Sequence, residues 1–212
     1  MCCRYFLSPS SELRPFLDAV SQSPLTKRLT SQLNRSLYTE GEIRPTNFVP
    51  VIAPSKNGEK SVFPMVWGFN LPHARGPLVN ARVETAASKP TFSESWRQRR
   101  CIIPASYYFE WEHHLNPVTG KKRTGSKYRI WPVGSSVTWL AGLYRIEEIN
   151  GINVPVFTVL TREPGEKIRF IHDRMPVIFP DEAVDEWIAP DAEPGEVLRQ
   201  SMTEMECEVD QS

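Results

Sequence analysis

The sequence predicts a single α+β domain: a strongly bent, mostly antiparallel, barrel-like β-sheet with peripheral helices. Three observations favour this class. About eight short apolar segments of β-forming residues are bounded by turn residues. Two of the connections contain Asn-Gly, the strongest short-range hairpin signal. The 19 prolines among 212 residues suit short elements joined by fixed turns better than a helical bundle. With no alternating strand–helix pattern and no Gly-rich phosphate loop, we expect no nucleotide-cofactor domain.

The expected elements follow in chain order. Helices are predicted over residues 10–20, 27–37, 84–88, 91–99 and 180–188, the first of them with Pro15 in its opening turn. Strands are predicted over residues 48–53, 61–69, 101–103, 107–111, 128–133, 137–147, 154–161 and 175–179. The Asn57-Gly58 and Asn150-Gly151 turns should make two hairpins. Residues 38–47 should form a polar loop, and residues 113–125 a polar, basic excursion between strands.

Composition limits the function classes. Twenty-five basic and 25 acidic residues cancel, so net charge neither favours nor excludes a nucleic-acid partner. The four cysteines have no paired spacing and no signal peptide is evident, so we expect a reduced, cytoplasmic protein. No apolar run approaches the ~20 residues of a membrane-spanning helix. We assign residues 1–190 to the domain and residues 191–212 to an acidic tail that should fray after Arg199.

The first two residues, Met1-Cys2, carry the most specific chemistry. Initiator methionine is removed when the next side chain is small, which would leave Cys2 with a free α-amine beside its thiol. Both groups titrate closer to neutral pH than a lysine ammonium does. Such a pair traps an aldehyde in two steps, because the amine condenses to a Schiff base and the thiolate then closes a thiazolidine. The alternative is that Cys2 is an ordinary residue near a terminus.

Three other stretches place polar groups where a core prefers apolar ones. Asn80 to Thr85 follows an apolar strand, with a capped helix start as the alternative. Glu110 lies among aromatic residues, and alternation puts it on one strand face with Tyr108. Enclosure should raise the pKa of Glu110, as general acid–base work requires, unless it faces water from an edge strand. His172 adjoins charges between apolar segments, so it suits proton transfer, although a structural loop histidine is the alternative.

Basic residues cluster at Arg97 to Arg100 and at Lys121 to Arg123 with Lys127 and Arg129. Such runs are usually solvated faces, but in a neutral chain they imply an uneven field that suits a phosphate backbone. No ligand pairs have zinc spacing, so we expect no metal site. The other histidines (His73, His113 and His114) lie in expected loops and receive no role.

Five motifs appear in order along the chain: Met1-Cys2-Cys3-Arg4-Tyr5, Pro64-Met65-Val66-Trp67-Gly68, Asn80-Ala81-Arg82-Val83-Glu84-Thr85, the Cys101–Trp111 stretch and Ile171-His172-Asp173-Arg174-Met175-Pro176. Together they resemble the SOS-response-associated peptidase (SRAP) domain family, the abasic-site processing proteins. The resemblance runs from residue 1 to about residue 190. It implies a bent sheet or barrel with peripheral helices, in agreement with the strand pattern.

The resemblance also implies a function. The matured Cys2 would crosslink to the ring-opened aldehyde of an abasic site in single-stranded DNA, and the thiazolidine would shield the lesion from strand cleavage. Glu110 resembles the acid–base group, His172 the proton shuttle and Asn80 the amide that holds the linkage. The remaining residues resemble contacts to the DNA backbone (Arg4, Arg82 and Arg174) and lining near the lesion (Pro45 and Thr161).

The resemblance further implies a monomer without cofactor, metal or membrane partner. We expect it to be cytoplasmic, associated with the nucleoid while crosslinked, and of bacterial or phage origin. Three features depart from the family pattern. Cys3 replaces the usual glycine, and Leu71-Pro72-His73 stands where some members carry tryptophans. Glu42-Ile43-Arg44-Pro45 keeps only the proline of the family's Asn-Val-Ala-Pro segment. Two other functions stay open. One is an N-terminal-nucleophile peptidase or hydrolase, including autoproteolytic removal of Met1. The other is a non-catalytic binding module that would tolerate Cys2→Ala.

Overall fold

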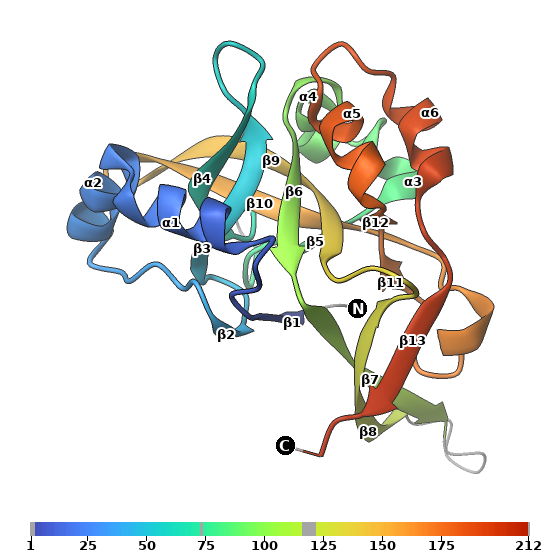
Figure 1. Cartoon of the computed structure of the whole chain (residues 1–212). Helices are drawn as coiled ribbons and strands as arrows, with labels where there is room; N and C mark the ends of the chain where they lie inside the picture. Colours follow the sequence, from blue (N-terminus) through green and yellow to red (C-terminus); the bar gives the residue numbers. More distant parts are fainter. Residues whose placement is uncertain (1–2, 73, 116–121, 212) are drawn as a thin grey trace.

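A closed five-stranded barrel forms the centre of the molecule (Figure 1). The computed structural model describes residues 3–72, 74–115 and 122–211. The barrel consists of β3 (Phe48–Pro54), β4 (Lys60–Trp67), β6 (Arg100–Ala105), β9 (Thr138–Ile149) and β10 (Ile152–Arg162). Neighbouring strands pair in the order β10-β4-β3-β6-β9, and β9 pairs with β10 to close the ring. Only the β4–β10 pairing within this ring is parallel.

Three short strands extend the barrel at one end. β5 (Asn80–Arg82) and β11 (Met175–Pro176) both pair with the last residues of β10. β12 (Ile178–Phe179) pairs with the beginning of β9. Thr161 of β10 therefore has Arg82 on one side and Pro176 on the other. This arrangement brings two polar stretches of the sequence, residues 80–85 and 171–176, to the same end of the barrel.

A second sheet continues from that end. It contains β1 (Arg4–Leu7), β2 (Gly41–Ile43), β7 (Tyr107–Leu115), β8 (Lys122–Pro132) and β13 (Met205–Val209), in the order β13-β8-β7-β1-β2. The chain passes from barrel strand β6 to β7 across one residue, Ser106, so a single sharply bent ribbon links both sheets. The ring of Trp67 in β4 stacks on Phe157 and also contacts Tyr5 of β1. The predicted fold class, an α+β domain with a bent, barrel-like sheet, is confirmed.

Helices cover the outside of the barrel (Figure 1). α1 (Arg14–Gln22) packs on β3 and β4, and α2 (Pro24–Leu33) packs on β4. Pro15 lies in the first turn of α1, where its missing N–H costs no helical bond, and Ser23 caps α2 by accepting from the Thr26 N–H at 3.0 Å. The other helical elements are α3 (Val83–Ala86), α4 (Pro90–Gln98), α5 (Val184–Ile188), α6 (Pro194–Val197) and the 3₁₀ turns η1 (Glu166–Ile168), η2 (Asp181–Ala183) and η3 (Leu198–Gln200). Within the part of the chain that the structure describes, no helix is long and apolar enough to cross a membrane.

Both predicted hairpins are confirmed. The Asn57-Gly58 turn joins β3 to β4, and the Asn150-Gly151 turn joins β9 to β10. Gly58 has φ +80°, and Asn150 and Gly151 have φ +53° and +76°. These are left-handed conformations that glycine and asparagine adopt at low cost, which explains why the dipeptide is so specific a signal.

Three local expectations were wrong. The loop expected at residues 38–47 contains β2, and the excursion expected at residues 113–125 is largely the paired ends of β7 and β8. The tail expected to fray after Arg199 forms η3 and then β13, which pairs with β8 from Met205↔Pro132 to Val209↔Tyr128. Met205 is fully buried, so its apolar side chain anchors the strand. The expected domain boundary near residue 190 stays a prediction, because a strand can complete a sheet of the domain that precedes it.

Candidate functional site

Glu110 lies in β7 and is only 3% exposed, so the alternative of an edge-strand glutamate facing water is wrong. β1 pairs with β7 through Arg4↔Phe109, so the next position along places Cys3 opposite Glu110. Together they line a cavity of about 390 Å³ whose walls are Cys3, Arg4, Glu110, Trp111, His113 and Thr124. Cys2 lies outside the described residues, but it precedes Cys3 directly in the chain.

Proton affinities in this cavity are shifted by burial. Burial raises the pKa of the Glu110 carboxyl, and the Asp173 carboxylate raises it further, while the Trp111 N–H that donates to Glu110 Oε1 at 3.3 Å lowers it. The direction agrees with the prediction from the aromatic surroundings. Burial also raises the pKa of the Cys3 thiol, and the negative charge of Glu110 raises it further. A carboxyl with this shift can both hold and release a proton closer to neutral pH than an exposed one.

His172 belongs to a loop, residues 171–174, that docks against β7. Its ring lies 4.9 Å from the ring of His113 at 79°, and the His113 N–H donates to the Ile171 carbonyl at 3.2 Å. His172 Nδ1 accepts from the Arg174 N–H at 3.0 Å and lies 2.8 Å from the Asp173 carboxylate. Only an unprotonated Nδ1 can accept the first bond, and only a protonated one can donate to Asp173. The loop therefore offers His172 a partner in either protonation state.

Arg174 ties the same loop to the barrel end. Its guanidinium forms a two-pronged pair with Glu84, Nη1–Oε1 2.7 Å and Nη2–Oε2 2.8 Å, and Nη2 also donates to the Thr161 carbonyl at 2.6 Å. The hydrogen bond from Arg174 lowers the pKa of Glu84. Arg174 has a side chain only 10% exposed, whereas Arg82, at the end of β5, is exposed. Asn80 begins β5 and pairs with Val159 of β10.

Arg4 and Pro45 lie on the other flank of the cavity. The Arg4 guanidinium carbon lies 5.0 Å from the centroid of the Trp111 ring, and Nη1 donates to Glu42 Oε1 at 3.0 Å. The same Glu42 oxygen accepts from Arg44 Nε at 2.8 Å. Pro45 occupies the turn after β2, which the Thr46 N–H fastens to the Trp67 carbonyl at 2.9 Å.

The structure thus brings the predicted residues into two adjoining groups joined by loop 171–174. One group surrounds Glu110 and includes His113, and His172 joins this group because its ring contacts the ring of His113. The other surrounds the end of β10 and contains Asn80, Thr161, Arg82 and Arg174. The roles that the sequence predicts for these residues remain predictions.

Sequence reasoning missed three participants: Glu84 as the partner of Arg174, Glu42 as the partner of Arg4, and His113, which had been assigned no role. The register of β7 shifts between Trp111 and His113, which brings His113 to the same cavity as Glu110, so simple alternation along the strand could not have identified it.

The two predicted basic clusters differ in character. Arg100 is 1% exposed and donates to carbonyls at the ends of α4 and α5, including those of Trp96 and Trp187 at 2.9 and 2.8 Å, so it is a structural residue. Lys121 lies outside the described residues. Lys127 and Arg129 of β8 pair with acidic residues in β13 and just after it: Lys127–Asp210 2.7 Å and Arg129–Glu208 3.0 Å. Among the described residues, no group of histidine, cysteine and acidic side chains has the arrangement of a metal site.

Comparison with known proteins identifies relatives along most of the chain. A family model described as SOS response associated peptidase (SRAP) matches residues 1–211. The abasic site processing protein YobE of Bacillus subtilis is 35% identical over 165 residues, which is 71% of each chain. YoqW of Bacillus phage SPbeta, another abasic site processing protein, is 34% identical over 71% of this chain and 70% of its own. YedK of Escherichia coli, of the same designation, is 30% identical over 59% of this chain and 54% of its own.

Solved structures share the fold. A protein from Bacteroides thetaiotaomicron superposes with a TM-score of 0.74 at 21% identity and covers all of this chain and 93% of its own. A phage-related protein from Bordetella bronchiseptica gives a TM-score of 0.68 at 19% identity, over all of this chain and 95% of its own. The barrel with its second sheet is therefore an established architecture.

Proposed function

The chain belongs to the SOS response associated peptidase (SRAP) family, and on that premise we propose that it processes abasic sites in DNA. We further propose that the α-amine and thiol of Cys2 capture the lesion in single-stranded DNA as a thiazolidine. The observation that carries the proposal is the position of Cys3 beside buried Glu110, in a cavity at the start of β1. One residue earlier in the chain, the matured terminus would enter the same cavity. The relation to Bacillus and phage proteins agrees with the expected bacterial or phage origin.

The proposed reaction is the condensation of an aminothiol with an aldehyde, which releases one water. Glu110 assists opening of the deoxyribose ring by transferring a proton to the ring oxygen, which exposes the aldehyde. The Cys2 amine adds to the aldehyde carbon, and loss of one water leaves an iminium. The Cys2 thiolate then adds to the iminium carbon and closes the five-membered ring. Removal of the iminium removes the group that would drive β-elimination, so the strand stays intact.

His172 is the proposed proton carrier for the carbinolamine. Dehydration needs a proton delivered to the leaving hydroxyl, and thiol addition needs a proton removed from sulfur. His172 suits both steps because its Nδ1 has the Arg174 N–H as donor when neutral and Asp173 as acceptor when protonated. Asn80 would hold the linkage through its side-chain amide, at the barrel end beside this loop.

The proposed DNA path runs over the basic residues that flank the cavity. Arg82 is exposed at the end of β5, and Arg4 is 34% exposed beside Trp111, which supports a proposed role for both in contacting phosphates. Arg174 would share its guanidinium between a phosphate and Glu84. Pro45 and Thr161 would line the space near the lesion. This assignment predicts binding without base preference, since contacts to the backbone carry no sequence information.

Denaturing electrophoresis tests the proposal. Single-stranded oligonucleotides with one abasic site should give a heat-stable shifted band with the full chain, and matched oligonucleotides with an intact thymidine should give none. The band should be absent in Cys2→Ala and present in Cys101→Ala, which removes a fully buried thiol elsewhere in the barrel. A band of equal intensity in Cys2→Ala would refute the proposed nucleophile. Cleavage of peptides without any DNA band would favour the hydrolase alternative.

A further inference from the structure

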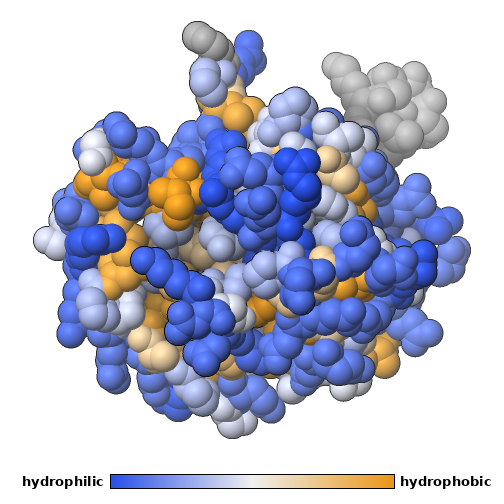
Figure 2. Space-filling view, turned by 90° about the horizontal axis from the view of Figure 1, so that it is seen from above, coloured by the Kyte–Doolittle hydropathy of each residue, from blue (hydrophilic) through white to orange (hydrophobic). Residues whose placement is uncertain are grey.

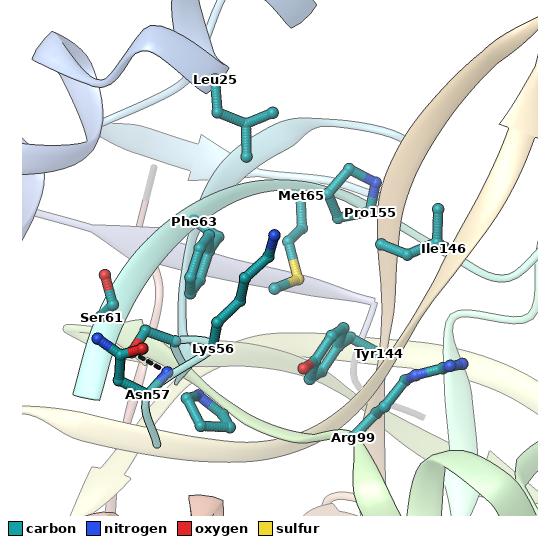
Figure 3. A pocket seen from close by; sticks show the side chains of 12 residues that line it. Leu25, Lys56, Asn57, Ser61, Phe63, Met65, Arg99, Tyr144, Ile146 and Pro155 are labelled. Atoms are coloured by element: carbon teal, nitrogen blue, oxygen red, sulfur yellow. Dashed lines mark hydrogen bonds between the residues drawn. The ribbon is translucent and has the colours of Figure 1, made fainter. Parts of the chain in front are cut away.

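A second cavity lies away from the proposed reaction site. It measures about 640 Å³ and is lined by residues of α2, the β3–β4 turn, β4, β9 and β10 (Figure 3). Its β10 residue is Pro155, whereas Thr161 of the same strand lies at the candidate site, so roughly 20 Å of strand separates them. The cavity is therefore at the opposite mouth of the barrel, within the ~300–1,000 Å³ range of small-molecule pockets.

The walls of this cavity are mainly apolar. Five side chains, from α2 and three strands, supply most of the apolar lining: Leu25, Phe63, Met65, Ile146 and Pro155. Ile146 is 51% exposed, which is unusual for a large aliphatic residue beside a cavity. Figure 2 looks down on the molecule and shows apolar side chains gathered on the side where α1 and α2 lie. A pocket with such walls favours a ligand with an apolar body.

Two hydrogen-bond donors face the same space. Figure 3 shows the Lys56 side chain reaching between Phe63 and Met65, and the Tyr144 hydroxyl directed into the pocket. Lys56 belongs to the exposed β3–β4 turn, so its ammonium is open to solvent as well as to the cavity. Burial raises the pKa of Tyr144, which keeps its hydroxyl a donor at neutral pH. Arg99 adds a further positive charge at the rim, where it pairs with Glu94 at 3.1 Å.

We propose that this barrel mouth binds a small organic anion, an apolar body of about ten carbons that carries a carboxylate. The apolar walls take the body, and Lys56 takes the carboxylate, while the Tyr144 hydroxyl offers a second donor at another part of the pocket. A cation is disfavoured, because Lys56 and Arg99 both repel it. The proposal is independent of the DNA chemistry at the other end of the barrel.

Displacement of a fluorescent anion tests the proposal. The full chain is loaded with 8-anilinonaphthalene-1-sulfonate and titrated with three ligands of equal chain length: decanoate, decanol and decyltrimethylammonium. Decanoate should displace the probe at about tenfold lower concentration than decanol, in keeping with a charge-assisted hydrogen bond, and the ammonium should be weakest. Equal displacement by all three head groups would overturn the assignment.

Matched variants locate the binding. Lys56→Met keeps the aliphatic stem and should weaken decanoate about tenfold while leaving decanol unchanged. Lys89→Met, at an exposed position before α4, should change neither. Methyl NMR of the wild type should show decanoate shifting Met65 and Leu25 and leaving Met202 in place. Unaltered decanoate binding in Lys56→Met, or shifts confined to other methyls, would refute the site.

Discussion

Arg174 and Glu84 form a two-pronged ion pair, with both carboxylate oxygens within 2.8 Å of the guanidinium. The pair connects loop 171–174, which carries His172, to α3, which follows Asn80 and Arg82 directly. Because Arg174 also donates to the Thr161 carbonyl, it fastens three segments of the candidate site with one side chain. Two residues that sequence reasoning treated separately are thus one structural unit.

Glu84→Gln should loosen this unit. Loss of the charge leaves a nearly buried guanidinium underpaired, so we expect the free energy of unfolding to fall by about 1–2 kcal/mol and the crosslinking rate to fall about tenfold. Urea denaturation and single-turnover crosslinking measure the two effects. Glu196→Gln is the control, since its pair with Arg199 is exposed and should contribute less than about 0.5 kcal/mol. Equal effects of the two substitutions would argue against the role of Glu84 in connecting loop 171–174 to α3.

Glu110→Gln should slow crosslinking by about 100-fold or more, because a general acid–base group is lost. The raised pKa of Glu110 also gives a stability signature. The folded protein holds this proton to higher pH than the unfolded chain does, so the wild type loses stability as pH rises from the ordinary glutamate range through the raised value. The glutamine variant lacks that loss. The free energy of unfolding of Glu110→Gln should therefore rise relative to that of the wild type across this pH window. A difference that stays constant with pH would contradict the assignment.

Cys3→Ser should leave crosslinking within about twofold of the wild type. Burial and Glu110 both raise the pKa of Cys3, so its thiol stays protonated and is a poor nucleophile at neutral pH. Crosslinking rates at saturating DNA test the prediction, with Cys207→Ser, on β13, as the matched control. Loss of the crosslink in Cys3→Ser alone would give the second thiol a role in the chemistry.

Glu208→Gln should strengthen binding to single-stranded DNA. Glu208 pairs with Arg129, which lies in β8 next to the strand of Glu110 and Trp111. In the variant, Arg129 keeps its longer contact, from Nε to Asp210 Oδ1 at 3.6 Å, so its partial release should raise affinity by up to a few-fold and steepen the salt dependence by less than about 0.7 in log–log slope. Fluorescence anisotropy at several salt concentrations measures both. Glu94→Gln frees Arg99 at the opposite barrel mouth and should leave both quantities unchanged; an identical response would show only a general charge effect.

Local signals predicted much of the barrel. The two Asn-Gly dipeptides predicted both hairpins, because Gly58 and Gly151 adopt the left-handed conformation of the turn at low cost whatever the rest of the chain does. The burial of Glu110 followed from its aromatic neighbours in the same strand. These features need no knowledge of distant segments, which is why the pattern alone predicted them.

The second sheet could not be predicted in the same way. β1 is stabilised by β7, which lies about a hundred residues away in the chain, and this pairing creates the cavity beside Glu110. The acidic residues of β13 led to the prediction of a frayed tail instead of a strand. The pattern of a half-buried strand was nevertheless present, since Met205, Cys207 and Val209 alternate with glutamates. The Arg174–Glu84 pair likewise joins segments that only the closed barrel brings together. Long-range pairing therefore determined the part of the site that the sequence left open.

Intact mass spectrometry under denaturing conditions tests the central claim most directly. The full chain is incubated with a single-stranded oligonucleotide that contains one abasic site, and then heated. We predict one adduct with the mass of the protein lacking Met1 plus the oligonucleotide minus one water, absent in Cys2→Ala. If protein confirmed to lack Met1 forms no adduct, or if Cys2→Ala forms the same adduct, the thiazolidine account is contradicted.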